Sequence, residues 1–434
     1  MFILASNTFD QKSKTNPLWA KIEQLSSEIE AKAVAWRRNI HQHPELGYQE
    51  FRTAKFVADH LKNLGMQVRT GVAQTGVVGI LRGKKDAPVI ALRADMDALP
   101  ITEAADAPFA SKVKTMYMGK EVGVMHACGH DVHTAVLMAV AEILSKVKDE
   151  LPGTVKFIFQ PAEELIPIPQ TEKGEASLIF KEQGASLMIK EGVLESPKPN
   201  AIFGLHVGVS YPVGTILYRS GGILSSVDVL EIIIKGSQSQ AGAPWNGIDP
   251  FVVASQVILG LQTIVSRQTN LLLTPAVVSF GVIQGGHHFG TIPDKVEMVG
   301  TIHAFDPKIR KEIHKRIQRT TKMIAESAGA TAEIKIDKVL PVTFNDPNLT
   351  KQMIPTLERV AGRKNLLVLP QVTYGEDFAF YQEKIPGLYF SIGNVPVGGK
   401  IVPNHSPNYY VDEKAILVGI RAMTNLAVDF LSSK

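Results

Sequence analysis

Short apolar runs alternate with helical patterns along the first half of this chain, and this alternation constrains its fold most strongly. Val77–Leu81 and Val89–Leu92 are continuous apolar runs typical of buried strands, Ala201–Val207 is a further buried strand, and Thr154–Gln160 is also expected to be a strand. Helical patterns lie around them, at Asn16–Ile40, which ends before His43-Pro44, and at His133–Lys146. This order predicts an α/β fold with a mixed, largely parallel sheet flanked by helices.

The pattern changes near Gly221, where a second unit begins. Its expected elements are a strand, a helix, two strands, a helix and a strand: Val227–Lys235, Pro250–Arg267, Ala276–Ile283, Lys295–Ala304, Pro307–Ala328 and Thr331–Ile336. This β-α-β-β-α-β order matches a ferredoxin-like domain. From Asn348 the chain resumes helix–strand alternation, and it ends in a helix from Glu413 to Leu431. We therefore expect a main domain at 1–221 and 339–434, split by an inserted domain at 222–338.

Composition narrows the class of protein. The 434 residues carry a net charge of only +4, and their lysines are scattered with few aromatics between them, which argues against a nucleic-acid partner. Continuous apolar stretches such as Ala135–Leu144 are too short to span a bilayer, so we expect a soluble protein. Met1–Ala5 is apolar but has no basic start. The expected location is the cytoplasm or, if that segment is the stub of a trimmed export signal, the periplasm or the exterior.

Metal-capable residues gather where predicted strands end. Asp95 and Asp97 share one side of an extended segment, and Cys128 and His130 stand two residues apart before a helix. The other candidates are Glu163, Glu164, His206 and His405. Each signal is weak alone, because a lone cysteine is usually packing, a lone loop histidine is usually solvated and paired glutamates usually lie on the surface. Their shared position at strand ends favours one metal site.

Other catalytic classes have little support in this sequence. It contains no His-Glu-x-x-His motif, no Gly-x-Ser-x-Gly elbow, no phosphate-binding loop and no Gly-x-Gly-x-x-Gly fingerprint. Its only cysteine, Cys128, excludes an intrachain disulfide.

Seven segments together resemble a known group of enzymes: His41–Gly47, Arg93–Pro100, His126–His133, Gln160–Glu164, Gly204–Val207, Gly375–Phe378 and Asn404–Pro407. The chain is similar to the hippurate hydrolase, auxin-conjugate hydrolase and N-acyl-amino-acid amidohydrolase family of dinuclear metallopeptidases, which includes aminoacylase-like and carboxypeptidase-like enzymes. The resemblance implies a zinc-exopeptidase-like catalytic domain with an inserted lid that also forms a homodimer or higher homo-oligomer.

The resemblance also implies roles for individual residues. Cys128 would bridge two divalent ions per subunit, with the remaining ligands being His130, Glu164, His206 and His405. Glu163 would be the general base. Three acidic residues would orient the ligands without binding metal themselves: Asp95, Asp97 and Asp131. A thiolate with imidazoles favours zinc, and manganese or cobalt also fits carboxylate and imidazole ligands.

Three positions in the inserted domain depart from the family. Gln240 replaces a histidine that is expected to reach into a partner subunit's site and stabilise the oxyanion. Gly290 and His303 replace an asparagine and an arginine associated with binding the substrate's carboxylate. Glutamine still donates a hydrogen bond but carries no charge. Three interpretations of this altered surface stay open. The substrate lacks the usual α-carboxylate or presents it differently, or His287, His288 and His303 supply replacement contacts, or the protein binds metal and ligand but turns over slowly. A shifted substrate is favoured over inactivity, because the whole set of metal-capable residues and Glu163 remain.

The sequence therefore predicts a metal-dependent hydrolase of N-acyl amino acids or related amide conjugates, with an atypical substrate preference. The competing interpretation is a weakly active or non-catalytic homologue that binds metal and ligand. A more distant one is an esterase that uses the same ions. Turnover separates the first two, because a binding protein would hold its ligand without releasing amine.

Overall fold

The computed structural model describes residues 16–164, 167–168, 179–180, 182–208 and 210–433. Met1–Ala5 lies outside the described residues. The larger of two main sheets has eight strands in the order β1-β2-β6-β3-β9-β20-β10-β19. Their bounds are β1 Gln67–Val72, β2 Gly76–Arg82, β3 Val89–Asp95, β6 Thr154–Gln160, β9 Ala201–Val207, β10 Ile216–Tyr218, β19 Leu366–Val368 and β20 Gly387–Ile392.

This sheet is mixed, with a parallel centre. Strands β6, β3, β9 and β20 run parallel, and β10 runs parallel to β19. The pairs β1–β2, β2–β6 and β10–β20 are antiparallel. Every side chain of β3 and β6 is buried, including the charged Arg93 and Asp95 of β3 and Lys156 of β6.

Helices cover both faces of the large sheet. One face carries the largest apolar core and a connected set of helices: α1 Leu18–Gln42, α2 Phe51–Asn63, α3 His130–Lys146, α7 Pro347–Ala361 and α9 Lys414–Ser432. Two shorter helices, α4 Gly184–Lys190 and α8 Ala379–Gln382, pack on a second core at the other face. In α1 the buried Ile22, Ile29, Ala33 and Ile40 recur at helical spacing, so one stripe faces the core.

The second main sheet has four antiparallel strands in the order β14-β16-β12-β17. Its elements are β12 Val227–Lys235, α5 Pro250–Gln268, β14 Ala276–Gln284, β16 Lys295–Ala304, α6 Pro307–Ser327 and β17 Thr331–Leu340. Alternate residues of β12, including Leu230, Ile232 and Ile234, are buried in a core shared with α5 and α6. The ferredoxin-like order and the mixed α/β class are confirmed.

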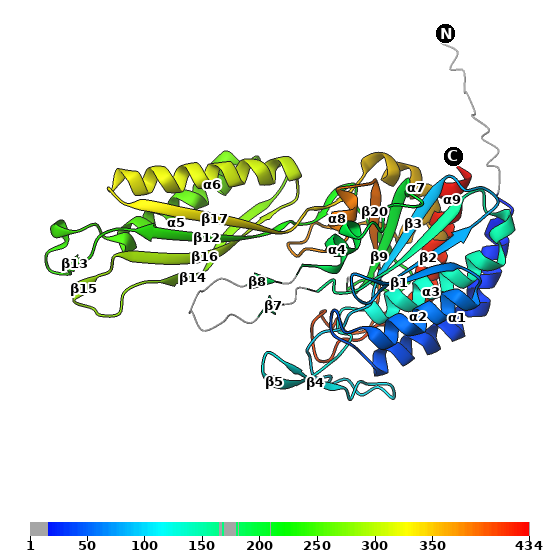
Figure 1. Cartoon of the computed structure of the whole chain (residues 1–434). Coiled ribbons are helices and arrows are strands. Elements are labelled where there is room, and N and C mark those ends of the chain that lie inside the picture. Colours follow the sequence, from blue (N-terminus) through cyan, green and yellow to red (C-terminus); the bar gives the residue numbers. More distant parts are fainter. Residues whose placement is uncertain (1–15, 165–166, 169–178, 181, 209, 434) are drawn as a thin grey trace, which may run out of the picture.

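The two sheets are joined by a short strand pair and together give an elongated molecule (Figure 1). β11 Gly221–Leu224 pairs with β18 Thr343–Asn345 where the chain leaves the larger sheet and returns to it. At the far end of the four-stranded unit, β13 Ser239–Gln240 pairs with β15 Thr291–Ile292. Domain boundaries at 221/222 and 338/339 remain a proposal.

Two further strand pairs are β4 Lys114–Tyr117 with β5 Lys120–Gly123, and β7 Pro167–Ile168 with β8 Ile179–Phe180.

Two helices, α5 and α9, are long and apolar enough to cross a membrane by length and composition alone. In α9, 72% of the most apolar 18-residue segment is buried inside the protein, as is typical of a core helix. In α5 the corresponding share is 33%, and its inner side contacts the four-stranded sheet. The sequence predicted both helices, but counting only uninterrupted apolar stretches did not mark either as long and apolar enough to cross a membrane.

Candidate metal centre and active site

Neighbouring parallel strands bring the candidate residues to one edge of the large sheet. Because β6, β3 and β9 are adjacent and parallel, their carboxyl ends meet there. β3 ends at Asp95, β6 leads into Glu163 and Glu164, and His206 is the penultimate residue of β9. Cys128 lies in the turn that starts α3. This edge is the usual position of a site in an open α/β sheet.

The turn before α3 requires glycine. Gly129 has φ +93°, a left-handed conformation that L side chains rarely adopt. A Cβ atom added there would lie 2.4 Å from Cγ1 of Val207, near the end of β9. The glycine therefore lets the turn between Cys128 and His130 pack directly on the strand that carries His206.

The five predicted ligands and Glu163 belong to one cluster. Potential ligand atoms lie within 4.8 Å of one another in three overlapping groups: Cys128 with His130 and His206, Cys128 with Glu164 and His405, and His130 with Glu163 and Glu164. Cys128 Sγ is 3.4 Å from His206 Nε2, and Glu164 Oε1 is 3.1 Å from His405 Nε2. Thiol, imidazole and carboxylate donors thus converge from four separate segments.

His130 is held in the orientation that a metal ligand needs. Its Nδ1 lies 2.8 Å from the backbone carbonyl oxygen of Asp97 and 3.2 Å from Oδ1 of the same residue, so this nitrogen is the donor. Its buried Nε2 has no hydrogen-bond partner among the described residues. The other carboxylate oxygen of Asp97 accepts the backbone N–H of Glu164 at 3.0 Å. The hydrogen bonds to Asp97 fix the orientation of the ring, and the unbonded Nε2 lies beside other potential metal ligands. This arrangement suits the binding of a divalent ion.

Glu163 lies among other carboxylates. Burial raises the pKa of Glu163 well above its ordinary value, and Glu376, Glu164 and Asp377 raise it further. The backbone N–H of Asp377 lies 3.4 Å from Glu163 Oε1. This concentration of buried negative charge would be relieved by cations, which agrees with the donor cluster beside it.

Arg93 is the buried cation that links these acidic segments. Its guanidinium donates to Gln160 at 2.8 Å, Asp95 at 2.6 Å, Glu376 at 2.9 Å and Asp377 at 2.8 Å. The ends of β3 and β6 and the loop before α8 are therefore tied to one planar donor group.

Two of the predicted supporting carboxylates contact different parts of the site. Asp95 Oδ1 lies 2.6 Å from His133 Nδ1, and His133 Nε2 accepts the N–H of Val207 at 2.9 Å. Asp95 thereby steadies the strand end next to His206. Asp131, in contrast, faces α1, where its Oδ2 accepts from Arg37 Nε at 2.7 Å. Among the described residues, Asp131 makes no hydrogen bond to a candidate ligand.

A pocket of about 650 Å³ opens beside the cluster. Cys128, Glu163, Glu164, His206 and His405 line one side. The other side comes from the base of the four-stranded unit and the loop before Glu376: Leu224, Val227, His303, Leu340, Thr373, Tyr374 and Gly375. The pocket therefore adjoins the candidate catalytic groups and is large enough for a small substrate.

The predicted substrate contacts are divided between two places. His303, near the end of β16, lines the pocket beside the metal-capable cluster. Gln240, on β13, lies at the far end of the four-stranded unit, and so do His287, His288 and Gly290 in the loop before β15. A separate hollow there is lined by His287, His288 and Phe289. Within one chain the structure does not bring these four residues to the candidate site.

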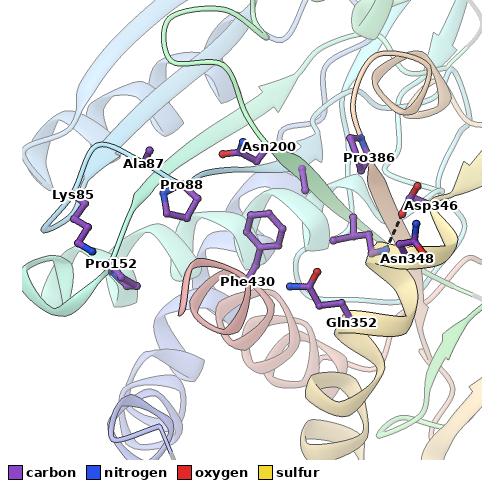
Figure 2. A pocket seen from close by; sticks show the side chains of 12 residues that line it. Lys85, Ala87, Pro88, Pro152, Asn200, Asp346, Asn348, Gln352, Pro386 and Phe430 are labelled. Atoms are coloured by element: carbon purple, nitrogen blue, oxygen red, sulfur yellow. Dashed lines mark hydrogen bonds between the residues drawn. The ribbon is translucent and has the colours of Figure 1, made fainter. Parts of the chain in front are cut away.

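A further pocket of about 660 Å³ lies at the opposite edge of the large sheet (Figure 2). It is lined by residues that precede or start strands, including Pro88, Asn200 and Pro386, and by Gln352 and Phe430 from two helices. Asp346 at its rim is engaged in capping α7, where it accepts the N–H of Leu349 at 2.7 Å. The candidate catalytic groups lie at the other ends of the strands, so this pocket is separate from them.

The model of the family described as peptidase family M20/M25/M40 matches residues 91–429. The chain belongs to this family. Two relatives of this M20 peptidase cover almost its full length. The N-acetylcysteine deacetylase of Bacillus subtilis is 39% identical over 92% of this chain and 96% of its own. Thermostable carboxypeptidase 2 of Saccharolobus solfataricus is 37% identical over 94% and 98%.

A solved structure supports the same assignment. The YXEP protein of Bacillus subtilis, described as a dinuclear metal binding peptidase of the M20 family, has a TM-score of 0.77 to this chain. The two are 36% identical, with 94% of this chain and 100% of the other covered. The predicted family and the prediction of a hydrolase acting on amide bonds are confirmed.

Several residues of this M20 peptidase site were not assigned a role from the sequence. Glu376 was noted only as part of a motif, and Tyr374, Leu224 and Leu340 have no chemical signature of their own. Glu50 supports the turn before Glu163 across 112 residues of chain. Its only sequence signal is an acidic residue next to a motif segment, which is too common to single it out.

Proposed function

We propose that this M20 peptidase hydrolyses the amide bond of N-acyl amino acids or related amide conjugates. Two divalent ions would be held by Cys128, His130, Glu164, His206 and His405, and Glu163 would be the general base. The observation that supports this most directly is the convergence of all six side chains in overlapping groups whose ligand atoms lie within 4.8 Å. Zinc suits the thiol and imidazole donors, and manganese or cobalt is compatible with the rest.

The protein's own groups can be given roles in this reaction. When bound, the ions supply positive charge that makes water a stronger acid and polarises an amide carbonyl. Glu163 would accept the proton of the attacking water and deliver it to the departing amine nitrogen. Asp97 would hold His130 and the backbone of Glu164 in place.

The names of two relatives support cleavage of an amide bond. One is named for deacetylating N-acetylcysteine, and another is named as a carboxypeptidase. Both names describe cleavage of an amide linkage, and the pocket of about 650 Å³ beside the cluster suits a small molecule.

We further propose that the protein acts as a homodimer or higher homo-oligomer. Gln240, His287, His288 and Gly290 lie at the far end of the four-stranded unit, away from the candidate site of their own chain. Contact with a substrate would require a second copy of the chain to lie against that end. Gln240 would then donate a neutral hydrogen bond to the developing oxyanion of the partner's substrate.

The test is amine release by metal-loaded protein from a panel of N-acyl amino acids that vary in acyl group and side chain. Metal-dependent release from at least one member is expected, and Glu163→Gln should abolish it while binding metal normally. A folded, metal-loaded protein that binds these compounds but releases no amine from any of them would favour the alternative, a ligand-binding homologue without turnover.

A further inference from the structure

The pocket beside the metal-capable cluster has a second wall, which we call the lid wall: Leu224, Val227, His303 and Leu340. Leu224 ends β11, Val227 begins β12 and Leu340 ends β17, while His303 is the penultimate residue of β16. All four come from the junction between the two sheets. The wall lines the same pocket as Glu163 and four of the candidate ligands.

Three members of the lid wall are aliphatic, and two of them, Val227 and Leu340, pack closely against Gly375. A Cβ atom added at Gly375 would lie 2.5 Å from Leu340 Cδ1 and 3.0 Å from Val227 Cγ2. The backbone of the loop that carries Glu376 thus rests directly on these side chains. Such packing fixes the wall's shape and leaves it little room to move away from a substrate.

His303 contributes an uncharged ring to this wall. Its Nδ1 lies 3.2 Å from the Ser225 hydroxyl, and its Nε2 lies 3.2 Å from the Thr301 hydroxyl. Both nitrogens are therefore engaged by the protein itself. Burial lowers the pKa of His303 below its ordinary value, so the ring is neutral near pH 7.

The lid wall itself contributes no charged group, and the charged groups of the pocket belong to the candidate metal centre and its surroundings. The described residues lining the pocket include Glu163, Glu164 and Glu376 but neither lysine nor arginine. A carboxylate placed against the lid wall would lose hydration without meeting a side-chain cation there. An apolar group in the same place would gain from leaving water.

We propose that the lid wall binds an uncharged, apolar group of the substrate, so that this enzyme prefers amides whose group at that position carries no carboxylate. This inference rests on the proposed amidohydrolase function and specifies its substrate class. The group is the part of the amide that extends from the candidate ligands towards His303. It can belong to the amine or the acyl side, and matched compounds distinguish the two.

The experiment compares two pairs of amides with full-length, metal-loaded protein. N-acetylphenethylamine and N-acetylphenylalanine differ by a carboxylate on the amine side. N-butanoylphenethylamine and N-succinylphenethylamine differ by a carboxylate on the acyl side. In at least one pair, kcat/KM should favour the uncharged member by about tenfold or more, since a carboxylate would be desolvated without a partner. Preference for the carboxylate member in both pairs, or no preference in either, would overturn the inference.

Variants at His303 locate the effect. His303→Arg places a cation in the wall and should shift preference towards the carboxylate member of the responsive pair, mainly through KM. His303→Gln is the matched neutral control, and it should keep the wild-type preference because it adds no charge. Equal shifts in both variants would show that the preference does not arise from charge at this wall.

Binding separates this inference from the proposed function. Calorimetric titration of the same four compounds into metal-loaded Glu163→Gln protein reports the preference of the wall without turnover. Tighter binding of uncharged members with no amine release by the wild type would sustain the lid-wall inference and overturn the hydrolase proposal. Turnover accompanied by tighter binding of the carboxylate members would sustain the hydrolase proposal and overturn the lid-wall inference.

Discussion

The backbone N–H of Ala162 donates to the Glu50 carboxylate over 2.8 Å, and Ala162 immediately precedes Glu163. Ala162 has φ +49°, an uncommon conformation for a residue with a side chain. The second oxygen of Glu50 accepts the Thr75 hydroxyl at 2.6 Å. A buried carboxylate from the start of α2 thus holds the turn that presents the candidate base.

Glu50→Ala should lower both stability and kcat, because it leaves the buried N–H of Ala162 and the Thr75 hydroxyl without partners. Each unsatisfied group costs about 1–3 kcal/mol. Thr75→Val is the matched control, since it removes one contact but keeps the hydrogen bond to Ala162. Urea unfolding and steady-state kinetics measure the two effects. Equal kcat losses in both variants would show that the Ala162 contact has no special role.

Glu163→Gln should reduce kcat by about 10²–10⁴-fold, the usual range for loss of a general base. The substitution keeps the size of the side chain and leaves the candidate ligands untouched, so metal content should not change. Glu164→Gln serves for comparison and should lower metal content as well as turnover. Wild-type turnover by the Glu163 variant, with metal bound, would remove Glu163 from the mechanism.

The buried Lys156 should make stability depend on pH in the alkaline range. Burial lowers the pKa of its ammonium group from 10.5 to about 8, although its Nζ donates to the carbonyl oxygens of Val193 and Glu195. The folded state therefore binds this proton more weakly than the unfolded state, and the contribution to stability is lost as pH falls from 10.5 to about 8.

Lys156→Met isolates this effect because it keeps the aliphatic stem. The stability of the wild type relative to this variant should rise between pH 8 and pH 10, as measured by urea unfolding at each pH. A stability difference that does not change over this range would contradict the lowered pKa.

Asp228→Ala should loosen the four-stranded unit. Asp228 is fully buried on β12 and accepts from Arg310 and, at 2.6 Å, from His314 Nε2, both on α6. Removing one partner of a buried ion pair costs about 3–5 kcal/mol, because the other charge stays buried. Faster hydrogen exchange in β12 and α6 is the expected readout. Glu333→Ala, which removes an exposed ion pair with Lys235, should change stability by less than about 1 kcal/mol.

The sequence predicted those features that have a local pattern. β6 and β9 were placed with their observed bounds, and the apolar run at the start of β9 marks a buried strand. Helix α3 begins at His130 rather than at the predicted His133, since its first turn carries site residues instead of an apolar stripe. β17 continues to Leu340, beyond the predicted end at Ile336, through a segment with two more charged residues.

Features that depend on contacts between distant segments could not be predicted in this way. The bond from Ala162 to Glu50 and the bonds from Arg93 to Gln160, Glu376 and Asp377 join positions far apart in the chain and leave no periodic signal. The separation of His303 from His287 and His288 follows from the length of β16, which puts its two ends at opposite ends of the four-stranded unit. Short strands such as β10 and β19 have too few residues for a recognisable pattern.

The most direct test of the central claim is metal content measured together with amine release, before and after stripping with a chelator. We expect about two divalent ions per chain, loss of release on stripping and recovery when zinc or manganese is restored. Cys128→Ala should fail to recover, because Cys128 belongs to two of the groups of metal-capable side chains. Undiminished amine release by metal-free, folded protein would contradict the account.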